Sequence, residues 1–115
     1  MLNTHDFKLP RQEMLRKSHI ETVLRFGKRW EGHTIKCFYL KADDRKVGFI
    51  VPKRLGKAVL RNRLKRLQRE VYRHYRKKLG TFWILLMAKQ TEPSFKRNDL
   101  EIDFCQFIEQ TGLYL

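Results

Sequence analysis

The run FWILLMA, residues 82–88, is apolar at every position. A half-exposed strand alternates apolar and polar residues, whereas a short run that is apolar throughout is typical of a strand buried on both faces of its sheet. The run is too short to cross a bilayer, which takes roughly 20 residues. We therefore expect one α/β (α+β) domain over residues 1–115, with residues 1–12 as an irregular N-terminal arm because Pro10 opposes a helix there.

A second strand and a long helix precede this run. Residues 47–51, VGFIV, predict the strand, and residues 57–79 predict the helix, which Gly80 ends. A helix between two strands suggests that the strands are parallel. At about 100° per residue, one side of the helix is apolar and should pack on the sheet. That side comprises Leu60, Leu64, Leu67, Val71 and Tyr75.

A short helix and a strand lie further upstream. Residues 18–27 favour the helix, with Ser18 and Glu21 as a capping box and Gly27 as its end. Residues 34–40 favour the strand, which we expect to run antiparallel to VGFIV.

A last helix is predicted over residues 99–111, with Asn98 or Asp99 as its cap and Gly112 as its end. Its buried stripe should comprise Leu100, Phe104, Phe107 and Ile108. Its acids, which argue against a second polyanion site, are Glu101, Asp103 and Glu109.

The positive charge of the chain is concentrated on the long helix. Lys and Arg number 26 against 12 Asp and Glu, a net charge of +14. Twelve of these cations lie between residues 53 and 78, where Glu70 is the one acid. Such a field attracts polyanions, nucleic acid first and anionic membrane second. A membrane-surface or calmodulin-type helix needs its apolar side free, whereas this helix needs that side for the core. Its cationic side comprises Lys65, Arg66, Arg69, Arg73 and Arg76.

No pattern in the chain predicts a self-sufficient catalytic or metal centre. The four histidines are scattered, and no P-loop, dinucleotide-binding or nucleophile-elbow motif occurs. Asp43 and Asp44 suit a turn better than a metal site. Cys37 and Cys105 lie in apolar contexts without metal-ligand spacing, which predicts buried free thiols in a reducing compartment. The N-terminus lacks a hydrophobic signal core, so we expect a cytoplasmic protein.

The sheet offers a possible second binding surface. Phe38 should share one sheet face with Lys36 and Leu40. An exposed aromatic on a face with a basic rim would suit single-stranded nucleic acid. The candidate rim residues are Arg16, Lys17, Lys53 and Arg54. Phe38 could equally be core beneath the first helix, and the sequence leaves both interpretations open.

The segment RNRLKRLQRE, preceded by VGFIVPKRLGKAV, resembles the signature of the bacterial ribonuclease P protein subunit family, in which an Arg-Asn-Arg motif opens a long basic helix. IETVLRFGKR resembles the family's short helix and FWILLMA its fourth strand, so the similarity spans residues 9–111. It implies a two-layer sandwich of the ribosomal-protein S5 domain 2-like type, with about four strands and three helices. It also implies a left-handed strand–helix–strand crossover, against the usual right-handed preference.

The resemblance further implies a function. The family's subunit joins a catalytic RNA that removes the 5′ leader of precursor tRNA by Mg²⁺-dependent endonucleolytic hydrolysis. The RNA carries the catalytic centre and most of the Mg²⁺. The chain should therefore bind RNA without catalytic residues, an intrinsic metal site or an organic cofactor, and should be a monomer when free, away from membranes. The alternatives are a ribosomal or general RNA-binding protein with the same fold, and a DNA-binding module.

The resemblance assigns two sets of residues. Those that match the motif and turn facing the catalytic RNA are Lys53, Arg54, Lys57, Arg61, Asn62, Arg63, Lys65, Arg66 and Arg69. Those in the cleft that grips the single-stranded leader are Arg16, Lys17, Ile20, Leu24, Lys36, Phe38 and Ile50. Ile20 and Leu24 stand where the family often has Phe. Stacking is worth roughly 1–3 kcal/mol per base, so we expect leader binding here to be weaker or to rely more on charge.

Overall fold

The computed structural model describes residues 9–89 and 97–115. Its helices are α1 (Lys17–Phe26), α2 (Ala58–Tyr75) and α3 (Arg97–Thr111). Its strands are β1 (Lys28–Glu31), β2 (Ile35–Lys41), β3 (Lys46–Ile50) and β4 (Phe82–Ala88). Single 3-10 turns cover Arg11–Glu13, Lys53–Leu55 and Arg76–Lys78. The expected irregular arm falls mostly outside the described residues, and its end belongs to the first of these turns.

The strands form one mixed sheet in the order β1-β2-β4-β3. β4 is parallel to β3 and antiparallel to β2, which confirms the parallel pair joined by the basic helix. β2 and β3 run in opposite directions as expected, but they are not neighbours because β4 lies between them. The all-apolar run takes an inner position, where protein covers both of its faces. The left-handed sense of the β3–α2–β4 connection stays a prediction.

β1 is a strand that the sequence pattern does not reveal. Its residues KRWE do not alternate, and three of the four are exposed. It pairs with β2 at one edge of the sheet, where charged side chains deter pairing with other chains. Its strand conformation therefore comes from the pairing with β2 rather than from its own composition.

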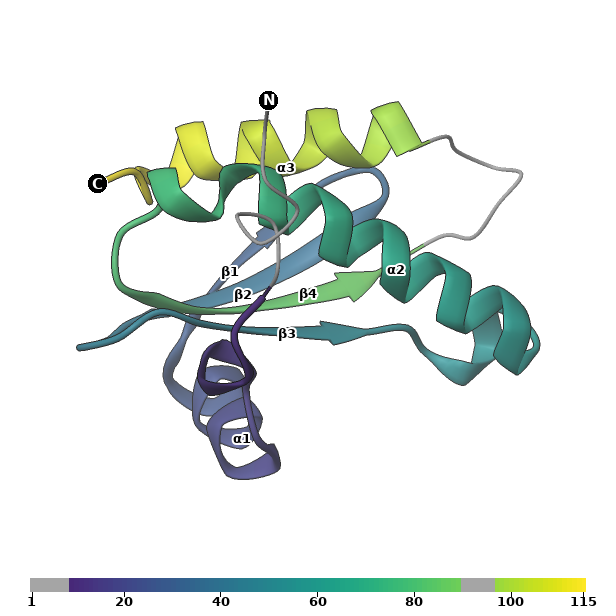
Figure 1. The fold of residues 1–115 in the computed structure, drawn as a ribbon, viewed down its shortest axis with the longest axis horizontal. Helices are drawn as coiled ribbons and strands as arrows, with labels where there is room; N and C mark the ends of the chain where they lie inside the picture. Colours follow the sequence, from purple (N-terminus) through teal and green to yellow (C-terminus); the bar gives the residue numbers. More distant parts are fainter. Residues whose placement is uncertain (1–8, 90–96) are drawn as a thin grey trace.

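The helices cover the two faces of the sheet unequally. α2 and α3 lie on one face and α1 lies on the other (Figure 1). The face under α2 and α3 carries the larger core, which includes Ile84 and Leu86 of β4. The face under α1 carries a smaller cluster built on Leu15, Val23 and Leu85. Successive β4 residues thus enter opposite cores, which confirms that this strand is buried on both faces.

α2 is anchored by only part of the apolar side that its sequence predicts. Leu64 and Val71 are buried, and Leu67 and Tyr75 are partly buried against the core. Leu60 is 40% exposed, so its expected place in the core is wrong. The reason is that the first turn of α2 extends past the end of β3 (Figure 1), where no sheet lies beneath it. The helix ends at Tyr75 and continues as a 3-10 turn before Gly80.

α1 begins one residue earlier than predicted and has a different cap. The backbone N–H of Arg16 donates to Nδ1 of His19 at 3.0 Å, so the expected Ser18–Glu21 capping box is wrong. Ser18 lies inside the helix, where its carbonyl accepts from the Thr22 hydroxyl. Gly27 ends α1 as predicted. A Cβ there would lie 2.8 Å from the Tyr39 carbonyl oxygen, so glycine is needed for the close approach of β2.

α3 packs through the predicted stripe, whose four members are all buried. Gly112 ends the helix with a positive φ of 69°, as expected of a glycine stop. The expected cap at Asn98 or Asp99 is wrong because the helix already includes Arg97. Asp103 does not face outward with the other acids. It is buried and accepts from the Thr34 backbone N–H at 2.5 Å and from the Thr34 hydroxyl at 2.6 Å, which ties α3 to the β1–β2 turn.

Both cysteines are free, as predicted. Cys37 is buried, and this burial raises the pKa of its thiol well above the ordinary value. Cys105 is only partly buried, so the prediction of a buried thiol fails there because its position on α3 lies at the margin of the core.

Replacing Leu64 by Ala should lower the free energy of unfolding by roughly 2–5 kcal/mol, because it opens a cavity between α2 and the sheet. Leu60→Ala is the matched control and should cost less than about 1 kcal/mol, since that side chain is already 40% exposed. Urea titrations of both variants measure the difference. Equal costs would contradict the packing described for α2.

Replacing Asp103 by Ala should lower the free energy of unfolding by about 1–3 kcal/mol or more, because the buried N–H and hydroxyl of Thr34 lose their acceptor. Glu109→Ala removes an exposed acid from the same helix and should stay within about 0.5 kcal/mol of the parent. Thermal melting of the two variants at one pH provides the comparison, and an unchanged melting temperature for Asp103→Ala would refute the tie.

Candidate nucleic-acid interface

The first candidate surface, which we call the motif surface, lies on the turn before α2 and on that helix as far as Arg69. It comprises Lys53, Arg54, Lys57, Arg61, Asn62, Arg63, Lys65, Arg66 and Arg69. Arg61 and Lys65 are partly buried, and the other seven are exposed. The basic turn and the start of α2 project from the sheet (Figure 1), and Arg69 lies further along the helix, over Phe49 of β3.

Gly56 forms the turn that leads into α2. Its φ of 140° lies in a range that L side chains rarely adopt. Its carbonyl accepts a hydrogen bond from Nε of Arg61 at 3.1 Å, which orients that guanidinium at the start of the helix. The basic turn and the basic helix are thereby held in one fixed arrangement.

The one acid of the basic segment does not neutralise the motif surface. Glu70 lies 3.6 Å from Arg97 of α3, so its carboxylate is engaged by another helix. Arg69 instead lies over the ring of Phe49, 5.7 Å from the ring centroid, a cation–π contact that orients the guanidinium. The positive field predicted from the sequence therefore remains at this surface.

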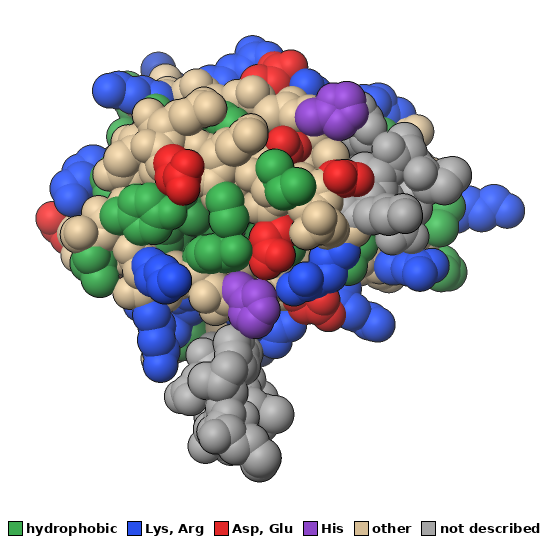
Figure 2. Space-filling view, turned by 90° about the horizontal axis from the view of Figure 1, so that it is seen from above, with side chains coloured by type: hydrophobic (Ala, Val, Ile, Leu, Met, Phe, Trp, Pro, Cys, Tyr) green, Lys and Arg blue, Asp and Glu red, His purple; other side chains and the backbone are tan. Residues whose placement is uncertain are grey.

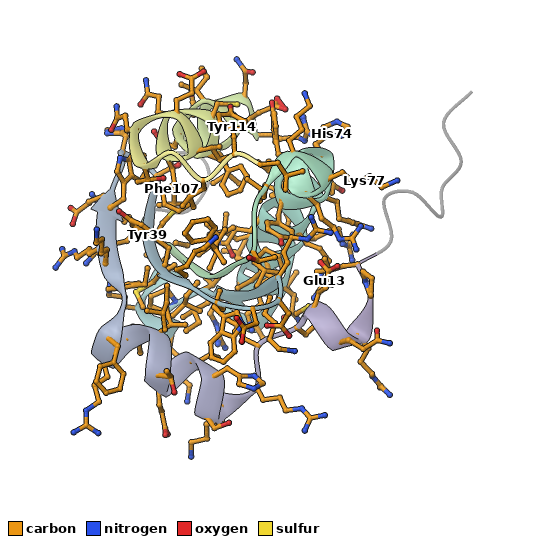
Figure 3. All side chains as sticks on the ribbon, turned by 90° about the vertical axis from the view of Figure 1, so that its left-hand side faces the viewer. Glu13, Tyr39, His74, Lys77, Phe107 and Tyr114 are labelled. Carbon is orange, nitrogen blue, oxygen red and sulfur yellow. The ribbon has the colours of Figure 1, made fainter. Side chains whose placement is uncertain are left out.

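Arg76 departs from the predicted cationic side. Its guanidinium makes two hydrogen bonds to the carboxylate of Glu13, and these raise the pKa of Arg76. Arg45 also lies 3.5 Å from that carboxylate and donates from Nη1 to the Arg76 carbonyl at 2.8 Å. Figure 3 shows Glu13 between the N-terminal turn and the end of α2. The cationic side therefore ends in a structural ion pair, which the sequence could not reveal because Glu13 is far away in the chain.

The second candidate surface, which we call the open sheet face, is the part of the sheet that α1 covers incompletely. Phe38 and Ile50 are only partly buried there, packed on the cluster around Leu85 and Val23. The two sequence interpretations of Phe38 are thus both partly right, since the ring contacts the core beneath α1 and also reaches solvent. Lys36 lies two residues before Phe38 on β2, so both are on the same face of the sheet, and Lys36 is also partly exposed.

Met87 is a member of the open sheet face that sequence reasoning missed. The register places it opposite Lys36 on β2 and opposite Ile50 on β3, so it lies in the middle of a row across three strands. It is partly buried. The alternation of β4 would have indicated its face, but only once the strand order was known.

α1 borders this face with apolar and basic side chains. Ile20 is partly buried in the cluster, and Leu24, one turn further along the helix, is 46% exposed. Arg16 and Lys17 are exposed at the start of the helix. The seven predicted leader residues thus lie on α1 and the residue before it, on β2 and on β3. Neither Ile20 nor Leu24 offers an aromatic ring.

Trp83 and Asp44 fix the end of this face where β4 begins. Nε1 of Trp83 donates to Oδ1 of Asp44 at 2.7 Å, and this hydrogen bond lowers the pKa of Asp44. The ring of Trp83 also contacts the ring of His19 on α1, with 4.8 Å between centroids. Asp44 therefore has a structural role in its turn.

The far side of the molecule is unlike these two surfaces. Figure 2, which looks onto the side covered by α3, shows acidic and apolar side chains among the tan atoms, with Lys and Arg mostly at the margins. In the part of the chain that the structure describes, no three His, Cys, Asp or Glu side chains gather as metal ligands would. Within the same residues, none of the helices combines the length and the apolar character needed to span a membrane.

Comparison with solved structures supports the fold. An RNase P protein of Staphylococcus aureus, a mutant with defective mRNA degradation activity, superposes with a TM-score of 0.82 over 90% of this chain and 92% of that one, at 18% identity. An RNase P protein of Thermotoga maritima, solved with 1-(4-fluorophenyl)-2-thiourea, gives a TM-score of 0.70 over 79% of this chain and 92% of that one, also at 18% identity. The chain thus shares the fold of bacterial RNase P proteins.

Comparison of sequences identifies the family. The ribonuclease P protein component of Dictyoglomus thermophilum is 44% identical over 73 residues, and the aligned part spans 61% of each protein. That of Syntrophomonas wolfei is 30% identical over 95 residues, 80% of each protein. The family model for Ribonuclease P matches residues 9–111. The chain therefore belongs to the ribonuclease P protein family.

Proposed function

We propose that this chain is the RNA-binding protein subunit of a ribonuclease P holoenzyme. It binds the catalytic RNA through the motif surface and the 5′ leader of precursor tRNA through the open sheet face. The observation that carries the proposal is the separation of two surfaces on one small fold, one strongly basic and one apolar with a basic border. A single general polyanion site would require only the first.

The chemistry of the motif surface suits a folded RNA backbone. Each Lys or Arg that neutralises a phosphate releases condensed counterions, which makes binding strong at low salt. Five of its nine residues are arginines, whose planar fork can engage two phosphate oxygens at once. Because the surface projects from the body at the start of α2, these side chains can reach a concave RNA surface without a clash from the sheet.

The open sheet face suits a flexible single strand. Phe38 supplies an aromatic ring, and Ile50 and Met87 extend the apolar floor across β4 and β3. Lys36, Arg16 and the other cations of the border can contact the phosphates while the bases lie on the floor. A duplex has no unstacked bases to offer such a floor, which favours the leader over the folded tRNA body.

Within the proposal, the chain assists cleavage but does not perform it. Several acids of the described residues are engaged in separate contacts, such as Asp103 with Thr34, Asp44 with Trp83 and Glu13 with Arg76. They offer no shared cage for Mg²⁺, so we propose that the RNA holds most of the metal and supplies the catalytic centre. The chain's own contribution is to bind, orient and neutralise phosphate charge, in the cytoplasm and as a monomer before assembly.

Reconstitution tests the whole assignment. The chain alone should leave precursor tRNA intact, and adding a bacterial ribonuclease P RNA with Mg²⁺ should give cleavage at the mature 5′ end, faster than the RNA alone at low Mg²⁺. Cleavage assays on labelled precursor tRNA measure this. Cleavage by nuclease-free chain alone, or no effect of the chain on the RNA, would reject the proposal. Preferential binding to ribosomal RNA or duplex DNA at matched salt would favour the other RNA-binding or DNA-binding functions.

Replacing Arg61 and Arg66 by Ala should weaken binding to ribonuclease P RNA and reduce the slope of log K against log salt by roughly one for each lost phosphate contact. The matched control replaces Arg25 and Lys28 by Ala, since both are exposed cations outside the motif surface. Filter binding over a range of salt gives both slopes. Equal slopes for the two double variants would show that net charge, not the motif surface, sets the affinity.

Replacing Leu24 by Phe should strengthen binding of precursor tRNA by the reconstituted holoenzyme, because a new stacking platform is worth roughly 1–3 kcal/mol per base. Binding of mature tRNA, which has no leader, should not change. Ile102→Phe is the control, because Ile102 is 48% exposed on α3, on the other side of the sheet. A gain that does not depend on the leader would argue against the open sheet face as its site.

A further inference from the structure

A hollow of about 380 Å³ lies between the N-terminal turn and the second half of α2. Of the described residues that line it, Arg69 belongs to the motif surface, and the family resemblance assigned no role to the others. Its lining residues are Leu9, Arg11, Met14, Arg69 and Arg73. We call it the arginine pocket. Figure 3 shows the N-terminal turn lying beside α2 at Glu13, which ties the two segments together.

The arginine pocket concentrates like charge. Among the described residues that line it, three of five are arginines and none is acidic. Arg69 and Arg73 are four residues apart on α2, so they project from the same side of the helix, and Arg11 comes from a segment more than fifty residues away. Like charges brought together in this way are destabilising, unless an anion binds between them.

The nearby acids do not neutralise the arginine pocket. Glu13 adjoins its wall but already accepts two hydrogen bonds from Arg76 and lies 3.5 Å from Arg45. Glu70, on the same helix as Arg73, pairs with Arg97. Within the described part of the chain, the carboxylates nearest in sequence are therefore committed to other cations, which leaves the charge of the pocket arginines for an external partner.

The guanidinium groups of the pocket are held by other contacts, and one of their N–H donors lacks an acceptor among the described residues. Nε of Arg73 is shielded from solvent and has no hydrogen-bond partner among the described residues. A buried donor without an acceptor is costly, which is the expected state of a site whose acceptor is a ligand. Arg69 is held over the ring of Phe49, and Arg11 is placed by the turn in which its carbonyl accepts from the Met14 N–H at 3.1 Å.

We propose that the arginine pocket binds one phosphodiester of the same RNA that the motif surface contacts; the inference rests on the proposed function. Arg69 belongs to both surfaces, so a strand lying on the motif surface continues into the pocket. At 1.5 Å per residue, Arg73 lies about 18 Å along α2 from Arg61, which lengthens the basic contact. Leu9 and Met14 give the pocket an apolar wall, which suits a sugar beside the phosphate better than a fully hydrated free anion.

The test compares Arg11→Gln with Arg73→Gln, as a double variant, against Arg25→Gln with Lys28→Gln, which removes the same charge elsewhere. The slope of log K against log salt for a bacterial ribonuclease P RNA should fall by about one in the pocket variant and stay at the parent value in the control. Thermal melting without RNA checks folding, and pyrophosphate should raise the melting temperature of the parent but not that of the pocket variant.

Each result has a defined meaning. If the pocket variant and the control have the same salt slope as the parent, the inference is overturned. It is also overturned if pyrophosphate stabilises the parent alone while the RNA slope is unchanged, because the pocket then serves a free anion. If the parent itself does not bind the RNA in preference to ribosomal RNA, the proposed function fails first. The Arg61 and Arg66 double variant, measured in the same assay, separates these cases because it tests the motif surface alone.

Discussion

The burial of β4 on both of its faces is the feature on which the other parts of this structure depend. A strand without a polar residue must be covered from above and below, so it occupies the interior of the sheet and separates β2 from β3. One cover is formed by α2 and α3 and the other by α1 (Figure 1). Because α1 is short and lies over only part of its face, the same requirement that buries β4 leaves a region of sheet accessible beside it. The open sheet face thus exists because the short helix α1 covers less of its side of the sheet than α2 and α3 cover on theirs.

α2 combines two tasks that are usually separate. Its buried Leu64 and Val71 attach it to the core, and its opposite side holds cations at a density that would repel one another in an isolated helix. Packing on the sheet supplies the stability that this charge density opposes. The first turn goes further, since it leaves the sheet altogether and carries an exposed Leu60. The first turn thereby loses burial and gains solvent access, which the proposed contact with a folded RNA requires.

The N-terminal turn links the two surfaces and the arginine pocket. Glu13 holds Arg76 and Arg45 at the junction of α2 and β3, and Leu15 donates its backbone N–H to the Val47 carbonyl at 2.8 Å. Arg76, the cation directly after α2, is thereby used for structure. The same contacts place Arg11 and Arg73 around one hollow, so that a structural ion pair lies next to a cluster of guanidinium groups without an acid among its described lining residues.

Local patterns were enough to predict β4, the parallel pair around α2, the apolar stripe of α3 and the basic residues at the start of α2. These features follow from the periodicity and charge of neighbouring residues, which the chain carries wherever it folds. The strand order, the edge strand β1, the buried Asp103 and the inward turn of Arg76 could not be predicted, because each depends on a partner that is distant in the sequence. The same holds for Met87 and for the arginine pocket. A linear pattern specifies which side of an element is apolar or charged, but only the packed fold brings residues such as Arg11 and Arg73 within reach of one ligand.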